Sequence, residues 1–242
     1  MAEEQAQQVA RAIRAALEHD RRVDLHDAAV KITGMAGEVV LEGEVADVEA
    51  LRVARSVALE AADQCRVADR LRRRRTETLP PDATAEQVLR QLANERNLAR
   101  CGLAAEGVPQ DWRGARDASA GRIVVGAEAD GVVRLSGELE SMAHARLAEA
   151  LTWWCPAVAR VQNDLAVGSP EVDLDGGLAD SLRLILELDP LVPEAQIGAR
   201  VSNGVITLAG LVETPAQAAF ARRDAWAMSG VLDVVDELRI AD

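Results

Sequence analysis

The sequence predicts an α+β fold made of three repeats of an αββαβ unit, each a three-stranded sheet covered on one face by helices. Three observations support this prediction. A hairpin motif occurs three times, a closing-strand motif follows each hairpin at a constant distance, and a capped helix lies between them. Self-similarity with constant internal spacing is the signature of a repeat architecture.

The hairpin motif consists of two glycines six residues apart, with a leucine at the fourth step. The three pairs are Gly37 and Gly43, Gly131 and Gly137, and Gly204 and Gly210. The closing motif, Val-x-(Asp/Asn)-x-Leu, is centred 26 residues after the second glycine, on Asp69, Asn163 and Asp236. Three matches with the same spacing indicate three diverged copies of one unit.

The turn residues predict the hairpins. Asp130-Gly131 and Asn203-Gly204 are typical of two-residue turns, because both residue types tolerate positive φ. The first copy has Gly34-Met-Ala-Gly37 instead, which predicts a longer loop after a strand over residues 28–32. The second glycine of each motif predicts a close approach to the backbone. A packed helix is the favoured neighbour, and a bound ligand is the alternative.

Each hairpin is followed by a helix with a good N-cap residue, namely Asp47, Ser141 or Thr214. Thr214 and Gln217 have the spacing of a capping box. Amphipathic helices are also expected ahead of the hairpins, over residues 3–19, 85–98 and 178–188. Thr84 and Gln87 predict a second capping box, at the start of the middle one.

Composition shifts divide the chain into three predicted domains. They span residues 1–75, 82–168 and 172–242, and we call them copies one, two and three. Copy one is the most diverged, and copy two has an insertion near residues 100–121. Proline and glycine mark the linkers, at Pro80-Pro81 and over residues 168–177.

The repeat resembles the BON domain (bacterial OsmY and nodulation). Copy three matches the family pattern nearly throughout, from Asp189-Pro190 through the Asn203–Gly210 hairpin to the closing Gly230–Leu238 strand, with Asp236 for the usual Asn. The resemblance implies a non-enzymatic role linked to envelope maintenance and osmotic stress, with anionic phospholipid as a ligand. One cytoplasmic type of BON-containing protein binds potassium. The family has no catalytic residues to carry over.

Candidate chemistry is sparse in this chain. No Ser, Cys or Thr lies in a nucleophile elbow, and no glycine-rich phosphate loop occurs. The sequence therefore predicts no enzyme, no cofactor and no metal site. Three histidines and three cysteines are the residue types that most often bind metals, but none of them has the spacing of metal ligands. They are His19, His26, His144, Cys65, Cys101 and Cys155.

Charge argues against nucleic acid as a partner. The net charge is −13, and residues 169–242 alone carry 13 acidic and 5 basic residues, a net charge of −8. The exception is the basic run Arg72, Arg73, Arg74 and Arg75. It is either a solvated linker or a contact with anionic lipid, nucleic acid or an acidic neighbouring domain.

Tryptophan supplies the second candidate surface. Trp153 and Trp154 either pack under the following loop or form a half-wet binding patch that Trp112 could join. Trp226 is predicted to be a core residue. The candidate binding surface is therefore Trp112, Trp153, Trp154 and Arg72–Arg75.

The N-terminus has no basic segment followed by an apolar stretch, and no apolar run reaches the roughly 18 residues of a membrane span, which predicts a cytoplasmic protein. We expect a non-enzymatic binding or scaffold protein, associated with stress or the envelope. Its partner is expected to be a protein, a second copy of the chain or a phospholipid surface. A potassium sensor is the alternative function.

Overall fold

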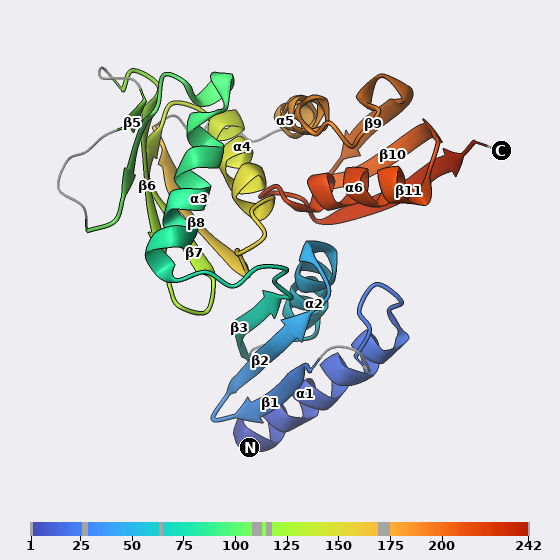
Figure 1. Cartoon of the computed structure of the whole chain (residues 1–242). Coiled ribbons are helices and arrows are strands. Elements are labelled where there is room, and N and C mark those ends of the chain that lie inside the picture. Colours follow the sequence, from blue (N-terminus) through green and yellow to red (C-terminus); the bar gives the residue numbers. More distant parts are fainter. Residues whose placement is uncertain are drawn as a thin grey trace. The chain divides into compact units, whose positions relative to one another are not determined.

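The computed structural model describes residues 2–25, 29–62, 65–107, 113–114, 118–168 and 175–241. The chain divides into two compact units, Met1–Arg74 and Arg75–Asp242. The first unit holds copy one, and the second holds copies two and three (Figure 1).

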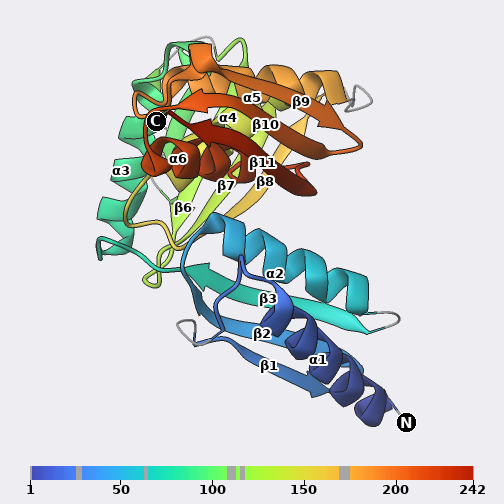
Figure 2. The ribbon, with the colours of Figure 1, turned by 90° about the vertical axis from the view of Figure 1, so that its right-hand side faces the viewer.

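Copy one has the expected element order. Helices α1 and α2 lie against the same face of its sheet (Figure 2). The central strand β2 pairs antiparallel with β1 and parallel with β3. The elements are α1 (Ala2–His19), β1 (Lys31–Met35), β2 (Glu38–Val45), α2 (Val48–Ala61) and β3 (Arg66–Arg73).

Copy two repeats this unit and enlarges its sheet. The predicted insertion forms two further strands, so the sheet has the order β5-β4-β6-β7-β8. β7 again pairs antiparallel with β6 and parallel with β8. The elements are α3 (Pro81–Ala93), η1 (Arg96–Leu98), β4 (Gly102–Ala105), β5 (Arg113–Gly114), β6 (Gly121–Ala127), β7 (Val132–Leu139), α4 (Met142–Trp153) and β8 (Arg160–Val167).

Copy three has the same pairing in a sheet of order β11-β10-β9. The predicted α+β fold of three αββαβ units is thus confirmed. The elements are α5 (Asp175–Leu188), η2 (Glu194–Gln196), β9 (Ile197–Ser202), β10 (Val205–Val212), α6 (Pro215–Trp226) and β11 (Asp233–Ile240).

The first hairpin differs from its prediction. Met35 pairs directly with Glu38, so the turn consists of Ala36 and Gly37, and the strand covers residues 31–35 rather than 28–32. Both turn residues have positive φ, 52° and 82°. The expected longer loop was wrong, because Ala36 adopts the left-handed conformation that Asp or Asn adopts more readily.

The start of α3 also differs. The N-cap is Pro80, and Pro81 is the first helical residue, where its fixed φ suits a helix. Thr84 therefore lies inside the helix, and its hydroxyl donates to the Pro80 carbonyl at 3.1 Å. The predicted Thr84–Gln87 capping box was wrong. The predicted N-caps Asp47, Ser141 and Thr214 are confirmed, the last as a complete capping box.

The second glycine of each motif approaches the backbone at the start of the neighbouring strand, so the expected packed helix was wrong. A Cβ atom on Gly43, Gly137 or Gly210 would lie 2.0–2.2 Å from a backbone carbonyl oxygen of Ala29, Arg122 or Gln196. These carbonyls belong to the start of the adjacent antiparallel strand or to the two residues before it. Each glycine also has a φ between +128° and +147°, which L side chains rarely adopt.

Helix α4 is buried almost all round. The nine consecutive residues Ala145–Trp153 are all buried, because α4 packs against its own sheet, against α3 and against α5 of copy three. Copies two and three therefore share a continuous interior. Among the described helices, none is both long enough and apolar enough to cross a membrane.

Candidate functional site

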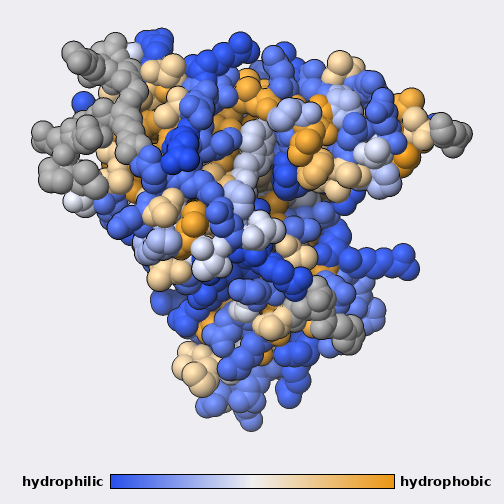
Figure 3. Space-filling model, in the orientation of Figure 1, coloured by the Kyte–Doolittle hydropathy of each residue, from blue (hydrophilic) through white to orange (hydrophobic). Residues whose placement is uncertain are grey.

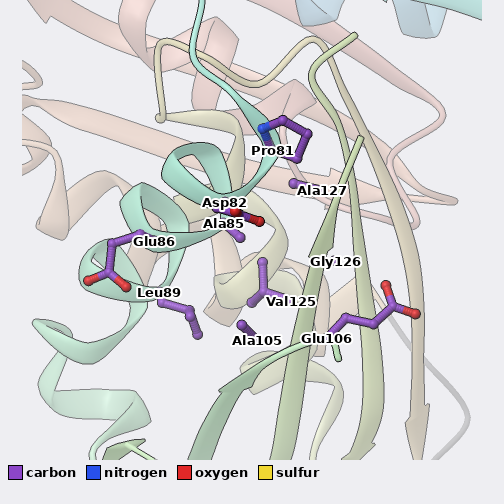
Figure 4. A pocket seen from close by; sticks show the side chains of 10 residues that line it. All are labelled: Pro81, Asp82, Ala85, Glu86, Leu89, Ala105, Glu106, Val125, Gly126 and Ala127. Atoms are coloured by element: carbon purple, nitrogen blue, oxygen red, sulfur yellow. The ribbon is translucent and has the colours of Figure 1, made fainter. Parts of the chain in front are cut away.

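A cavity of about 330 Å³ lies between α3 and the ends of β4 and β6 (Figure 4). Leu89 and Val125 contribute to its apolar floor. Asp82 lies on the side that faces the strands, whereas Glu86 and Glu106 extend away from the floor (Figure 4). The cavity thus has one carboxylate beside its apolar floor and two more at its rim.

The cavity reflects how the first helix of a copy meets its sheet. Gly34 in β1 and Ala127 in β6 hold the same repeat position, opposite Val39 and Val133. In copy one the helix backbone comes so close that a Cβ on Gly34 would lie 2.1 Å from the Ala6 carbonyl oxygen. In copy two the residue at the same position, Ala127, lines the cavity instead.

The chemistry of the remaining candidates is limited. His19 caps the end of α1, with Nδ1 2.7 Å from the Ala15 carbonyl oxygen, and His26 lies outside the described residues. Cys101 and Cys155 are buried, and burial raises the pKa of the Cys101 thiol. Across the part of the chain that the structure describes, no three His, Cys, Asp or Glu residues form a group that could hold a metal ion.

The junction of copies two and three is built around Arg146 of α4, which is 1% exposed. Its Nε donates to the Ser229 carbonyl at 3.1 Å, and its Nη1 lies 3.5 Å from Ser181 Oγ of α5. Both partners belong to copy three. A buried guanidinium needs such hydrogen bonds, so Arg146 ties the docking of the two copies to a fixed geometry.

A second polar group joins the same two copies. Trp154 Nε1 donates to Asp224 Oδ1 of α6 at 2.9 Å. Arg223 donates to the same oxygen and, at 2.5 Å, to Asp189 at the end of α5. Burial raises the pKa of Asp224 to about 7, although the Arg223 charge acts in the opposite direction.

The predicted tryptophan surface is only partly available. Trp153 is 2% exposed, so it belongs to the interior and not to a surface patch. Trp154 is half-buried, and Trp112 lies outside the described residues. The shared repeat position of Trp153 and Trp226 could have predicted that Trp153 is buried. Trp153 stands 12 residues after its helix N-cap Ser141, as the correctly predicted core residue Trp226 does after Thr214.

The basic run is not a solvated linker throughout. Arg72 and Arg73 belong to β3, and the Arg74 backbone N–H donates to the Val45 carbonyl at 2.8 Å, which extends the ladder. Arg75 begins the second unit. A ligand contact by these arginines stays a prediction.

The closing motif has a structural explanation. In each copy the Asp or Asn oxygen accepts the backbone N–H of the Leu two residues later, at 2.9–3.2 Å. The strand lies at the edge of its sheet, where outward N–H groups have no neighbouring strand. The side chain satisfies this donor and blunts the edge against pairing with another strand. The three pairs are Asp69 and Leu71, Asn163 and Leu165, and Asp236 and Leu238.

Copy three has a distinct uncovered sheet face. Helix α6 packs on the side of Ile206, Leu208 and Val234, which are buried. The alternate positions point to the opposite face, where Leu211 is 50% and Val235 is 40% exposed. Five of the seven large exposed apolar side chains among the described residues belong to copy three: Leu191, Leu211, Leu232, Val235 and Ile240. Figure 3 shows apolar patches among the polar surface of this copy, at the upper right.

Comparison with known proteins identifies the repeat. The BON domain family model matches residues 5–74, 110–169 and 175–242. The second match begins within the predicted insertion, after α3 and β4.

Two solved structures of CdsD, a structural protein of the type III secretion system of Chlamydia trachomatis, are similar over most of the chain. One, of its C-terminal domain, has 13% identity over 96% of each chain, and the other has 14% identity over 97% of this chain and 94% of that one. Both have a TM-score of 0.24, which supports no argument about function. No curated protein matches the sequence.

Proposed function

The chain belongs to the BON domain family, and we propose that it is a scaffold protein whose third copy presents the main docking surface for a protein partner. BON domains are binding modules without catalytic activity.

The observation that carries the proposal is the uncovered face of copy three. Its central strand presents a mostly apolar strip of Val205, Thr207, Ala209 and Leu211, in which Thr207 is the one polar side chain. Val235 lies beside Thr207 on the adjacent strand. Charged side chains of both signs surround this strip. They are Arg200, Asp233, Glu237 and Arg239.

An apolar centre with a polar rim of mixed charge is the usual anatomy of a protein–protein interface. The corresponding faces of the other copies are more polar. In copy two, Arg134 on that face bonds Gln162 and Asp164. In copy one, Lys31 pairs with Glu42 at 3.3 Å. Copy three is therefore the favoured docking module.

Charge favours a protein over an anionic membrane. Residues 169–242 have a net charge of −8, which opposes the approach of copy three to anionic lipid. Copies two and three form one compact unit and copy one another, so a scaffold could use them together to gain avidity for a repeated partner.

The test replaces Leu211 and Val235 together by Asp in the full chain. Affinity capture from cells of the source, followed by mass spectrometry, should retain at least one protein on the wild type that the double variant loses. Met35→Asp is the matched control, because Met35 is an exposed apolar residue at the end of β1 in copy one. Equal capture by all three chains would contradict the proposal.

Lipid binding is measured separately by co-sedimentation with neutral and anionic vesicles at low and moderate salt. We expect no binding that depends on anionic lipid. Salt-sensitive binding that is lost on replacing Arg72–Arg75 by Ala would instead favour the phospholipid role.

We also propose that the scaffold acts in the cytoplasm under osmotic stress. Cell fractionation tests the location. Growth of a deletion strain at high osmolarity, with and without the Leu211 and Val235 double variant, tests the role. Normal growth of the deletion strain would rule out the stress role under those conditions.

A further inference from the structure

A second pocket lies where the C-terminal half of α3 meets the end of α4, away from the copy-three face. Its volume is about 260 Å³. The residues that matter here are Gln87, Arg90, Gln91, Asn94, Trp154 and Pro156. All are described residues of the second unit.

The lining groups have a specific chemistry. Three are side-chain amides, each with both donors and an acceptor, and one is an indole. The amides of Gln91 and Asn94 make no hydrogen bond within the described residues, so their donors and acceptors are available to a ligand. Gln87 Nε2 donates to Glu77 at 2.8 Å, whereas its buried Oε1 has no hydrogen-bond partner among the described residues.

The pocket also limits the charge and size of its ligand. No carboxylate lines it, and Arg90 faces Glu86 at 3.9 Å on the same helix. The charge of Arg90 disfavours a cation, and its exposed pair with Glu86 weakens its attraction for an anion. The volume lies just below the usual range for drug-sized ligands, roughly 300–1,000 Å³, which indicates a ligand about the size of a single ring.

Trp154 is held in place from copy three. Its Nε1 donates to Asp224 at 2.9 Å, which fixes the orientation of the indole, while the side chain stays half-buried at the pocket. A fixed, part-exposed indole is suited to stacking against the C–H face of a saturated ring. Copy three thus orients one wall of a pocket that copy two forms.

We propose that this pocket binds a neutral, hydroxyl-rich ring of the size of one monosaccharide unit, stacked on Trp154 and hydrogen-bonded to Gln91 and Asn94. Each amide can bond two neighbouring hydroxyls, one as donor and one as acceptor. Because these bonds replace bonds to water, the affinity is expected to be modest, with a Kd on the order of 1 mM.

The experiment is titration of the full chain with glucose by ligand-observed NMR and calorimetry. Sorbitol has similar hydroxyls but no ring, and adenosine has a flat aromatic ring. We expect saturable binding of glucose, with sorbitol and adenosine about tenfold weaker. Preferred binding of adenosine would overturn the saccharide assignment.

Two variants and one control locate the site. Trp154→Leu and Gln91→Ala should each weaken glucose binding by about tenfold, whereas Gln162→Ala, on the sheet face of copy two, should leave it unchanged. Trp154→Leu also removes the bond to copy three, so a loss of binding in this variant alone could come from undocking. Gln91→Ala leaves that bond in place and changes only the pocket. No saturable binding of any probe, or unchanged binding in both pocket variants, would overturn the proposal.

Discussion

Copies one and two place the same helix position in opposite environments. Leu59, Trp153 and Trp226 each stand 12 residues after the N-cap of their helix. Leu59 is 54% exposed, whereas Trp153 is 2% and Trp226 is 1% exposed. α2 packs on α1 and its own sheet, but α4 also packs on α5 of the next copy. The same repeat position is therefore exposed in copy one and buried in copies two and three.

The largest expected effect tests this comparison directly. Trp153→Ala should lower the free energy of unfolding of the second unit by about 3–5 kcal/mol, because it leaves a cavity in the interior. Leu59→Ala should lower that of the first unit by less than about 1 kcal/mol. Urea unfolding followed by fluorescence reports on the second unit alone, since all four tryptophans belong to it, and circular dichroism reports on both units. Equal losses would contradict the comparison.

Arginines at a second shared helix position sharpen the comparison between copies one and two. Arg52 and Arg146 each follow the N-cap by five residues, but Arg52 is half-buried and Arg146 is buried at the junction. Arg146→Ala should cost about 2–3 kcal/mol, because it removes bonds to Ser229 and Ser181 made by a buried charge. Arg52→Ala should cost about 1 kcal/mol or less.

Combining Arg146→Ala with Ser181→Ala in a double-mutant cycle isolates the contact between copies two and three. A coupling energy near zero would show that the cost arises within copy two instead.

Protonation of Asp224 gives the junction a pH dependence that copy one should lack. Because burial raises the pKa of Asp224 to about 7 from 3.8, the folded chain holds a proton there that the unfolded chain releases. Stability of the second unit should therefore fall as pH rises from about 4 to 7, by at most about 1.4 kcal/mol per pH unit. Above about pH 7 this contribution is constant.

The Asp224 carboxyl is surrounded by Arg223, Asp189 and Trp154. Asp224→Asn is the best comparison, because it keeps the size of the side chain among these neighbours and removes only the titrating group. Subtracting the stability profile of this variant from that of the wild type isolates the carboxyl. Parallel profiles of wild type and variant across pH 5–8 would contradict the prediction.

The smallest expected effect concerns a feature that all three copies share. Asp69→Ala should cost about 1 kcal/mol, because it removes the acceptor of the Leu71 N–H at a sheet edge. Asp69→Asn keeps an acceptor oxygen, as Asn163 does in copy two, and should cost little. Chemical denaturation followed by circular dichroism measures both. An equal cost for the two variants would assign the effect to charge rather than to the hydrogen bond.

Much of the fold could be predicted from local signals. Asp47, Ser141 and Thr214 cap their helices as expected, because a capping side chain bonds its own helix within a few residues. The error at Thr84 arose because Pro81 is an equally valid helix start, and the choice depends on the preceding chain. The candidate surface was less predictable, because the same helix position is exposed at Leu59 and buried at Trp153.

The sequence by itself determined the unit and its number. Spacing of glycines, leucines and Asx residues reports on turns, strand alternation and edge capping, which act within one copy. The tertiary structure alone decided which copies share an interior, that Arg146 and Trp154 meet copy three, and that the insertion widens one sheet. The contacts of Arg146 and Trp154 join residues 35 to 83 positions apart, and no local periodicity encodes the surface that a second domain will cover.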